Sequence, residues 1–443
     1  MKFLFIENRE KTLFWDKVAL SLEGQGHTVH WLIQNHKFRP NKSLNTAATV
    51  LPYPSIKKEA IDDEEMWIRE NHPFLIADRG RTFFHAGIGH YDCYKSAIGD
   101  VLNNYQPDLV VGESTLFHEL LAIHLCKEKG IAYVQPMSNR YPRGRFSLLS
   151  FDSQIPIVES KEEWSHEQAL DLAKRIATST EVPFYMSAPT GSVKLRQQLA
   201  WVAARGRVWL GRLGGERYNT PSLSRKLELR QMVRRNLMRW NALERLPKAA
   251  KQTVLYPMQL QPESNIDVWG RPYSDQVDFI KRLLSAIPEN FEIAIKANPK
   301  AKYELTDEFL MLAEKEKRIC LLPVRLPMSG ALEQALGAIT ITGTIGFEAM
   351  CGKGRALSLR HPIIENEFPA FHAETPEVAV RRIVEDPHAG VGNIEIGAKL
   401  IQRFVNQSFP GIVGDPISYP SCMNQKNISA VAAALMCVQP PIK

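Results

Sequence analysis

A stretch rich in glycine and threonine, TGTIGFEAMCGKGRALSL, occupies residues 342–359 and follows the apolar run AITI. In a parallel sheet, ligands bind beyond the carboxyl ends of the strands, so hydroxyls and helix-start N–H groups at this junction suit an anion. An acid in the first helical turn suits the hydroxyls of a ribose. A tight turn capped by threonine explains the same pattern, so this stretch alone leaves both interpretations open. The candidate ligand-binding residues here are Thr342, Gly343, Thr344, Gly346 and Glu348.

Two more polar stretches follow predicted strands in the same half of the chain. YPMQLQPESN, with YSDQ shortly after it, places Gln261 and Glu263 directly after one strand, and IKANP places Lys296 and Asn298 at the end of the next. The carboxyl ends of parallel strands meet at one edge of a sheet. The sequence therefore predicts that three strand ends offer polar groups at the same edge.

The elements that must position these residues alternate between strand and helix. This βαβ order predicts an α/β fold with two Rossmann-like domains facing a cleft, and residues 36–90 and 137–190 are predicted as irregular loops around it. The predicted strands lie at 2–6, 28–32, 108–111, 132–135, 253–256, 292–296, 320–324, 338–342 and 356–359, and the predicted helices at 12–23, 94–104, 115–129, 274–286, 306–315, 329–336 and 346–351.

The positive charge of the chain is concentrated in residues 191–250. This segment holds 14 Lys or Arg against three Glu, a net charge of +11, whereas the whole chain carries +7. Tryptophans and leucines interleave with the arginines, which suits basic amphipathic helices on an anionic membrane surface. A solvated helical insertion whose arginines pair with acids elsewhere is the alternative. Nucleic acid is disfavoured as a partner because no nucleic-acid-binding module accompanies the charge.

The composition excludes several other classes of protein. No stretch approaches the roughly 20 unbroken apolar residues of a membrane span, and MKFLFI runs directly into ENR, too short for a signal-peptide core. We therefore expect a cytoplasmic protein, either free or peripheral on the inner face of the cytoplasmic membrane. The six cysteines are widely spread without a CxxC pair, which predicts free thiols and no metal site.

The motifs YPMQLQPESN with YSDQ, IKANP and TGTIGFEAMCGKGRALSL, in this order, resemble the capsule polysaccharide synthesis family, GT-B glycosyltransferases of bacterial surface polysaccharides. The resemblance covers the C-terminal half; in the N-terminal half only PDLVVGES and KEKGIAYVQP are similar. It implies transfer of an ulosonic acid, Kdo or a nonulosonic acid such as pseudaminic acid, from a CMP-sugar to a glycan or lipid-linked acceptor. The CMP-sugar is a donor substrate, and the resemblance implies no cofactor and no metal.

The resemblance also implies that different domains of the chain bind the acceptor and the donor. We predict an acceptor-side domain at 1–190, the basic helical insertion or linker at 191–250, a nucleotide-sugar-binding domain at 251–390, and C-terminal helices at 391–443 that pack back across the domains.

One position departs from the family pattern. The family usually has His-Pro at the end of the second motif strand, where this sequence has Asn298-Pro299. Asparagine donates a hydrogen bond to a phosphate but does not titrate near neutral pH. Lys296 is then the expected source of positive charge. His361-Pro362 follows a later predicted strand and is expected only as a neighbour of the cleft.

The resemblance ranks the candidate catalytic residues. Glu263 lies inside a resembling motif and is the strongest acidic candidate, either in catalysis or in donor binding. The acceptor hydroxyl needs a base from the N-terminal domain, and Glu113 and His118 in VVGESTLFHE are the candidates. Each has an ordinary explanation too, because the helix dipole favours an acid at a helix start and histidine is common on helix surfaces.

A basic loop, NRYPRGRF, supplies Arg140, Arg143 and Arg145, which suit an anionic sugar carboxylate or a lipid-linked acceptor, although a basic surface loop explains them as well. Two other functions stay open. A UDP-sugar-dependent hexosyltransferase or sugar-nucleotide 2-epimerase uses the same fold and would need a UDP-sugar site. A non-catalytic membrane-peripheral scaffold would use the basic segment as its working part.

Overall fold

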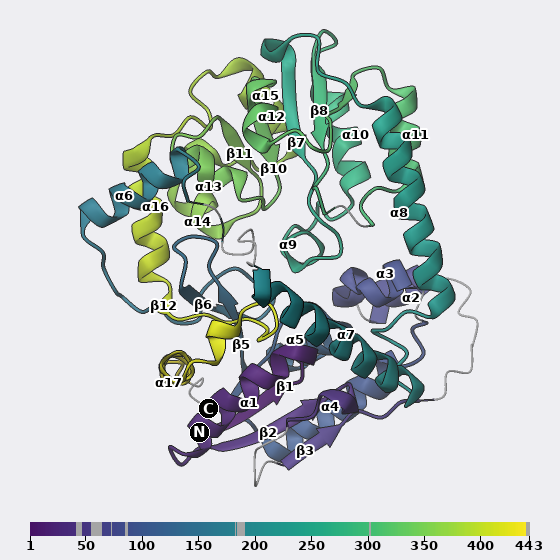
Figure 1. Ribbon diagram of the computed structural model, residues 1–443, viewed down its shortest axis with the longest axis vertical. Coiled ribbons are helices and arrows are strands. Elements are labelled where there is room, and N and C mark those ends of the chain that lie inside the picture. The colour runs from purple at the N-terminus through teal and green to yellow at the C-terminus, as the bar shows by residue number, and fades with distance from the viewer. Residues whose placement is uncertain are drawn as a thin grey trace. The chain divides into compact units, whose positions relative to one another are not determined.

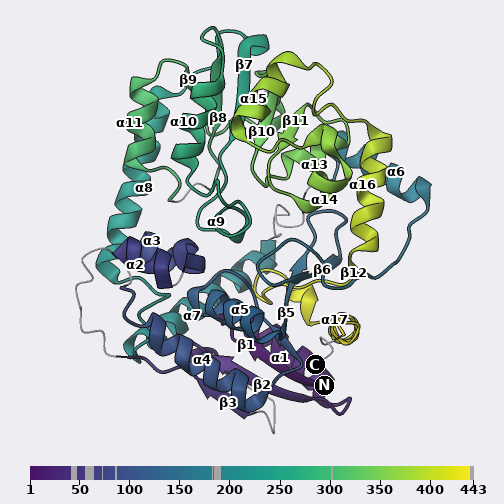
Figure 2. The ribbon, with the colours of Figure 1, turned by 180° about the vertical axis from the view of Figure 1, so that it is seen from behind.

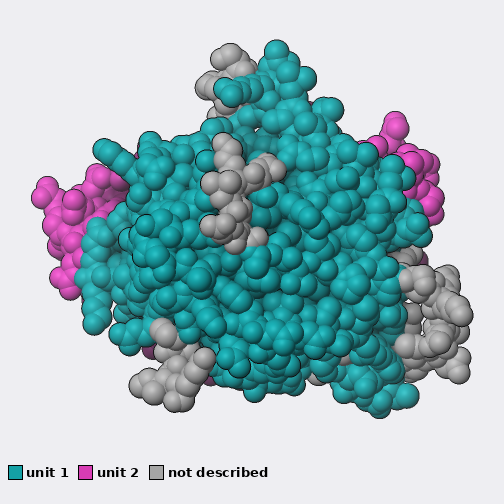
Figure 3. Space-filling view, turned by 90° about the horizontal axis from the view of Figure 1, so that it is seen from below, with its two compact units in different colours: residues 1–162, 183–222, 404–443 teal, residues 163–182, 223–403 magenta. Residues whose placement is uncertain are grey.

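A computed structural model describes residues 1–40, 47–54, 64–71, 73–84, 87–181, 183, 191–300 and 303–439. The chain forms two compact units, coloured separately in Figure 3. Unit 1 comprises Met1–Glu162, Pro183–Ser222 and Phe404–Lys443, and unit 2 comprises Glu163–Val182 and Leu223–Arg403. The basic segment 191–250 is therefore shared between the two units.

Unit 1 is built on a seven-stranded sheet with the order β12-β6-β5-β4-β1-β2-β3. The strands from β5 to β3 run parallel, whereas β6 is antiparallel to β5 and β12 is antiparallel to β6. The strands are β1 (Lys2–Ile6), β2 (Thr28–Ile33), β3 (Ala47–Val50), β4 (Leu109–Val111), β5 (Ala132–Ser138), β6 (Arg145–Ser150) and β12 (Phe409–Pro410).

Helices cover both faces of this sheet, which Figures 1 and 2 show from two sides. The face that carries Phe5 and Trp31 packs against Phe14 and Trp15 of α1 and against α17. On the opposite face, the His30 ring contacts Tyr105 of α4. The helices of unit 1 are α1 (Thr12–Glu23), α2 (Glu64–Asn71), α3 (Arg79–Phe84), α4 (Tyr91–Tyr105), α5 (Phe117–Lys129), α7 (Gly191–Leu213) and α17 (Gln425–Met436).

Unit 2 is built on an all-parallel sheet with the order β11-β10-β7-β8-β9. The central strands are buried along their whole length, which explains their nearly continuous apolar sequences TVLYP and EIAIK. The strands are β7 (Thr253–Pro257), β8 (Glu292–Lys296), β9 (Ile319–Leu321), β10 (Gly337–Thr340) and β11 (Ala356–Ser358).

One face of the unit 2 sheet packs against α10, α11, α15 and Trp240 of α8, and the other face packs against α12 and α13. Helix α16 begins in unit 2 and ends in unit 1. The helices are α6 (His166–Ala177), α8 (Leu223–Leu243), α9 (Ser264–Asp267), α10 (Gln276–Ala286), α11 (Asp307–Lys315), α12 (Met328–Glu333), α13 (Ile345–Met350), α14 (Pro362–Glu367), α15 (Pro376–Glu385) and α16 (Ile394–Asn406).

The predicted α/β class with two Rossmann-like sheets is confirmed, and two such units are the components of a GT-B fold. The prediction of irregular loops over 36–90 and 137–190 is wrong in part. The first range contains β3, α2 and α3, and the second contains β6 and α6. None of the described helices combines the length and the apolar composition that crossing a bilayer requires.

Candidate functional site

The loop that follows β7 in unit 2 is held by a buried glutamine, Gln276, at the start of α10. Its Oε1 accepts hydrogen bonds from the Tyr256 hydroxyl and the Gln259 N–H, both at 2.8 Å. Its Nε2 donates to the Gln259 carbonyl at 2.8 Å and to Gln261 Oε1 at 2.9 Å. The side-chain oxygen and nitrogen of Gln276 thus both hold the motif YPMQLQ in place. Gln276 itself lies in the motif YSDQ.

The predicted donor-binding residue Gln261 is occupied by contacts within this loop. Besides accepting from Gln276, it donates through Nε2 to Asp267 Oδ1 at 2.7 Å and to the Ser274 carbonyl at 3.1 Å. Asp267 Oδ2 in turn accepts the Glu263 N–H at 2.9 Å. Gln261 therefore positions the loop, and the carboxylate that the loop presents to solvent is that of Glu263, which is exposed and accepts from Asn265 Nδ2 at 3.2 Å.

The end of β8 places Lys296 and Asn298 at the same edge. The Lys296 ammonium is buried and donates to the carbonyls of Ala297 at 3.0 Å and Val324 at 2.8 Å. Burial lowers the pKa of this ammonium. Asn298 is half-buried, and its Oδ1 accepts the Lys300 N–H at 2.8 Å. The amide NH₂ of Asn298 is consequently the donor that this strand end offers to a ligand.

The third strand end, after β10, forms a tight turn. Gly343 N–H donates to Thr340 Oγ1 at 2.9 Å, and Gly346 N–H donates to the Gly343 carbonyl at 3.2 Å. A Cβ on Gly343 would lie 2.3 Å from Thr340 Oγ1, so glycine is required there. Both N–H groups are thus used inside the turn in this structure, and the predicted binding of an anion by Gly343 and Gly346 stays a prediction. Helix α13, which follows, has only six residues and begins at Ile345, after Thr344.

Hydrogen bonds join the first and third motifs. Gln259 Nε2 donates to Thr340 Oγ1 at 3.4 Å, and Thr342 Oγ1 lies 3.2 Å from Gln259 Oε1 and 2.9 Å from the Asn265 carbonyl. Asn265 Oδ1 is buried and has no hydrogen-bond partner within the described part of the chain.

The predicted ribose-binding residue Glu348 forms an ion pair with Lys353, with its Oε2 at 2.7 Å from Nζ. The sequence did not indicate this partner. His361 lies beside the same helix, because its ring meets the Phe347 ring edge-to-face at 4.8 Å between centroids. The later His-Pro pair is thus a neighbour of the third motif.

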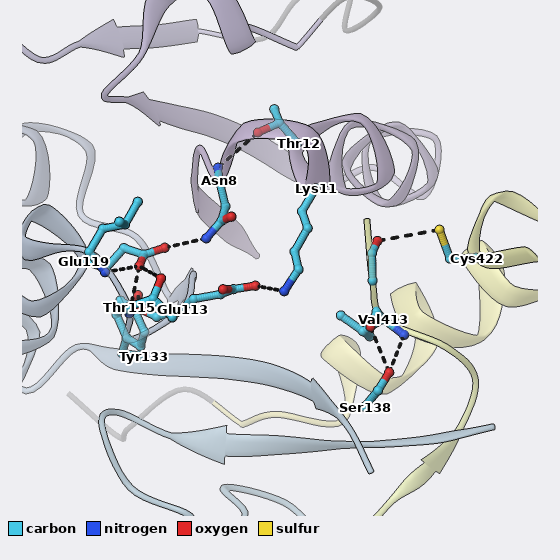
Figure 4. A network of polar contacts seen from close by, with 12 residues as sticks. Asn8, Lys11, Thr12, Glu113, Thr115, Glu119, Tyr133, Ser138, Val413 and Cys422 are labelled. Carbon is cyan, nitrogen blue, oxygen red and sulfur yellow. Dashed lines mark hydrogen bonds and ion pairs between the residues drawn. The ribbon is translucent and has the colours of Figure 1, made fainter. Parts of the chain in front are cut away.

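In unit 1, the predicted base Glu113 follows β4 and forms an ion pair with Lys11, shown in Figure 4. Although burial opposes the charge, the Glu113 carboxylate raises the pKa of the Lys11 ammonium. The two side chains keep 15% and 32% of their surfaces exposed. This pair is a charged and accessible site at the carboxyl edge of the sheet. Its lysine was missed because it lies 102 residues away in sequence.

Figure 4 also shows how a second carboxylate, Glu119, holds the start of α5. It accepts from Asn8 Nδ2, Thr115 Oγ1 and two backbone N–H groups, all at 2.9 to 3.0 Å. The other predicted base, His118, is completely buried, with its Nδ1 3.5 Å from Asn219 Nδ2. Because its ring has no exposed surface, it does not reach a bound acceptor, and Glu113 is the accessible candidate.

Arg145 does not belong to a surface loop. It is 5% exposed in β6, and it donates to the Ser408 Oγ and carbonyl, the Val405 carbonyl and Glu162. The predicted role of Arg145 in holding an anionic ligand is therefore wrong. Arg143 of the same stretch is exposed, and Arg140 is half-buried.

Unit 1 also buries two carboxylates that the sequence did not indicate. Glu7, directly after β1, accepts the N–H groups of Arg9, Asn35 and Gln34. Burial raises the pKa of Glu7 to about 7, against the effect of the Asn35 and Arg9 N–H groups. Glu216 is fully buried and accepts from Gln34 Nε2 at 3.0 Å. The carboxylates of Glu7 and Glu216 hydrogen-bond the loops at the sheet edge to one another, and solvent does not reach them.

The chemistry that these two edges support is binding and proton transfer. In the described parts of the chain, no group of three or more His, Cys, Asp or Glu is arranged to hold a metal ion. Unit 2 offers hydroxyl, amide and carboxylate groups, and unit 1 offers an accessible carboxylate beside an ammonium.

Comparison with known proteins gives weak likenesses. No family model matches the chain, and no curated protein matches it. Among solved structures it is similar to the UDP-GlcNAc 2-epimerase from Methanocaldococcus jannaschii, with 14% identity, 91% of this chain and 99% of that chain covered, and a TM-score of 0.26. It is also similar to the S. aureus MnaA–UDP structure, with 11% identity, 90% of this chain and 94% of that chain covered, and a TM-score of 0.28. The likeness to the calicheamicin glycosyltransferase CalG4 has 11% identity, covers 91% of this chain and 94% of that chain, and has a TM-score of 0.26. These TM-scores are low, so the likenesses assign no substrate and no reaction to this chain.

Proposed function

We propose that this protein is a metal-independent glycosyltransferase that transfers an ulosonic acid, Kdo or a nonulosonic acid such as pseudaminic acid, from a CMP-sugar to a glycan or lipid-linked acceptor of a bacterial surface polysaccharide. One observation carries the proposal. The motifs on which the resemblance to the capsule polysaccharide synthesis family rests lie at one edge of the unit 2 sheet, and Gln259 bonds the first motif to Thr340 and Thr342 around the third. Residues that are distant in sequence are thereby brought together at one edge of the sheet.

In the proposed reaction, a bond forms between the acceptor oxygen and the anomeric carbon of the sugar, and the bond from that carbon to the phosphate oxygen breaks. The cytidine monophosphate leaves with the electron pair. The Asn298 amide and the Thr344 hydroxyl stabilise its charge, and the buried Lys296 contributes a positive field without direct contact. Glu113 takes the acceptor proton, and Glu263 contacts the donor.

The test is the effect of nucleotides on the melting temperature of the purified protein, with CMP, UMP, UDP and GDP compared at equal concentration. A ligand that binds only the folded state stabilises it by about 2.7 kcal/mol at 100 times its dissociation constant. We expect CMP alone to raise the melting temperature, and a Thr342→Val variant to lose that rise.

The other outcomes distinguish the alternatives. Selective stabilisation by UDP would replace the proposal with a UDP-sugar hexosyltransferase or a 2-epimerase, and incubation with UDP-GlcNAc would then separate transfer from epimerisation. Stabilisation by none of the four nucleotides would favour the non-catalytic scaffold.

A further inference from the structure

Helix α7 of unit 1 exposes an apolar stripe that only Gly206 interrupts. Of the 14 large hydrophobic side chains that are exposed within the described residues, five lie on this one helix. Their spacing of three, four or eight residues places them on a single face over five turns. The stripe consists of Leu195 (64% exposed), Leu199 (65%), Val202 (64%), Leu210 (53%) and Leu213 (78%).

The opposite face of α7 fixes the orientation of the helix within unit 1. Ala204 is 1% exposed, and a Cβ on Gly211 would lie 2.4 Å from Asn35 Oδ1. Arg207 stands over the Phe38 ring at 5.9 Å. Small residues thus bring one face of the helix against the loop after β2. The apolar stripe faces solvent because the other side of the helix is the packed one.

Arginines border the stripe on both sides, and α7 contains no acidic residue. At 100° per residue, Arg196 and Arg207 lie along one border, and Arg205 and Arg212 lie along the other. Arg212 donates to the Thr220 carbonyl. The exposed Arg196 and Arg205 form no ion pair with any residue that the structure describes.

Helix α8, the other half of the basic segment, behaves differently. Arg235 pairs with Asp307 at 2.6 Å, and Arg239 pairs with Glu314 at 2.9 Å. Together with Arg225, which pairs with Glu228 at 3.1 Å, these arginines of α8 follow the alternative in which they pair with acids of the same unit. The exposed Arg230 and Arg234, in contrast, form no ion pair with a described residue. The difference is that α7 contains no acid and its exposed arginines border an apolar face, whereas three of the five arginines of α8 are paired with acids.

We propose that α7 is a membrane-surface helix that lies parallel to an anionic bilayer, with its apolar stripe between the acyl chains and its arginines among the lipid phosphates. An exposed apolar face bordered by cations on both sides is the pattern of such interfacial helices. A second copy of this chain is a poorer occupant, because pairing two identical faces would bring unneutralised arginines together. The inference does not depend on the proposed enzymatic activity.

The test is co-sedimentation of the full chain with vesicles of phosphatidylcholine mixed with phosphatidylglycerol, and with vesicles of phosphatidylcholine alone. We expect binding to the anionic vesicles only. Raising the salt from about 0.1 M to about 1 M shortens the Debye length from about 10 Å to about 3 Å and should release the protein. An Arg196→Gln/Arg205→Gln variant and a Leu199→Gln/Leu210→Gln variant should each weaken binding by at least about tenfold.

The matched control is Leu227→Gln/Met238→Gln on α8, where both side chains are similarly exposed, at 55% and 58%. It should bind as the unmodified protein does. All the substitutions lie at exposed positions, and unchanged melting temperatures would verify that each variant folds.

Three results would overturn the proposal. Equal binding to neutral vesicles would mean apolar adsorption only, and equal loss in the α8 control would mean that α7 has no special role. Self-association without vesicles that is lost in Leu199→Gln/Leu210→Gln would identify a second copy as the occupant of the stripe.

Discussion

At the scale of single residues, the candidate carboxylates differ in what surrounds them. Glu263 is exposed at the tip of a loop that Gln276 and Asp267 hold in place. Glu113 keeps a small exposed surface beside the Lys11 ammonium. Glu348 is neutralised by Lys353. A fixed carboxylate that reaches solvent is what contact with a substrate requires, and this favours Glu263. Glu113 and Glu348 are alike by this criterion, since each pairs with a lysine and they keep 15% and 13% of their side-chain surfaces exposed.

Replacing Glu263 by glutamine should lower the transfer rate by at least about 100-fold, the range expected for a residue that acts in proton transfer or charge stabilisation. The melting temperature should stay unchanged, because the side chain is exposed and makes one hydrogen bond, to Asn265. Transfer of radiolabelled sugar from the CMP-sugar measures the effect. Glu289→Gln, at another exposed position of unit 2, is the matched control. A rate within threefold of the control would remove Glu263 from the site.

The same measurement on Glu113→Gln tests the acceptor side. Loss of transfer with retained CMP stabilisation would place Glu113 in the chemistry and not in donor binding. If Glu113→Gln transfers normally, or if it loses the response to CMP, the assignment of the base is wrong.

Glu7 gives the protein a predictable dependence of stability on pH. Burial raises the pKa of Glu7 from 4.5 to about 7 in the folded protein. Between these values the folded protein keeps a proton that the unfolded chain has lost, so the contribution of Glu7 to stability falls as pH rises through this interval. The upper bound of this loss is about 3 kcal/mol. In Glu7→Gln the fall of melting temperature between pH 4.5 and 7 should be smaller, and parallel curves for the two proteins would contradict the raised pKa.

At the scale of elements, the site depends on a contact between a loop and a helix. Gln276 at the start of α10 makes four hydrogen bonds, one with Tyr256 of β7 and three with Gln259 and Gln261 in the segment that follows β7. Gln276→Leu would leave several buried polar groups unsatisfied, at a cost of about 1–3 kcal/mol for each group that water does not reach. We expect a lower unfolding free energy in urea together with loss of CMP stabilisation. Ser285→Ala, on the exposed face of the same helix, should change neither.

The sequence predicted elements well where their pattern is local. The predictions of 2–6, 12–23 and 292–296 agree with β1, α1 and β8 residue for residue. β6 was missed although it pairs with the neighbouring strand β5 across a short loop, because the irregular pattern of residues 137–190, rich in aromatics, Pro and His, favoured loops. In the site, the motifs located the strand ends. Lys11 became the partner of Glu113 only through three-dimensional proximity, because the two residues are 102 positions apart, whereas Lys353 lies five residues after Glu348 and was overlooked within the motif itself. The role of Gln276 could have been predicted from the sequence, because this residue belongs to the motif YSDQ on which the family resemblance partly rests.

At the scale of the whole molecule, the chain passes between the two units four times, and its C-terminal segment returns to unit 1. Helix α17 buries Ile428, Val431 and Leu435 in the core that contains Phe5 and Trp31 of the N-terminal strands. Both ends of the described chain therefore stabilise the same sheet, and unit 2 lies between them in sequence.

Arg145 links the segment in which the chain first leaves unit 1 to the segment in which it re-enters unit 1 near the C-terminus. It bonds to Glu162, the last residue before the chain enters unit 2, and to Val405 and Ser408, just after the chain returns. Arg145→Met should lower the unfolding free energy of unit 1 by about 2–4 kcal/mol, because buried carbonyls lose their donors. Arg145→Lys should recover only part of this loss, since an ammonium does not reproduce the guanidinium fork.

Urea unfolding followed by circular dichroism measures this loss, and CMP stabilisation reports on unit 2, where no change is expected. Arg143→Met, an exposed position in the same stretch, is the control and should unfold as the unmodified protein does. If Arg145 instead held an anionic acceptor, Arg145→Met would keep its stability and lose acceptor binding, because a ligand contact contributes nothing to the unliganded fold. The combination of unchanged urea midpoint and raised acceptor KM would therefore restore Arg145 to the binding site.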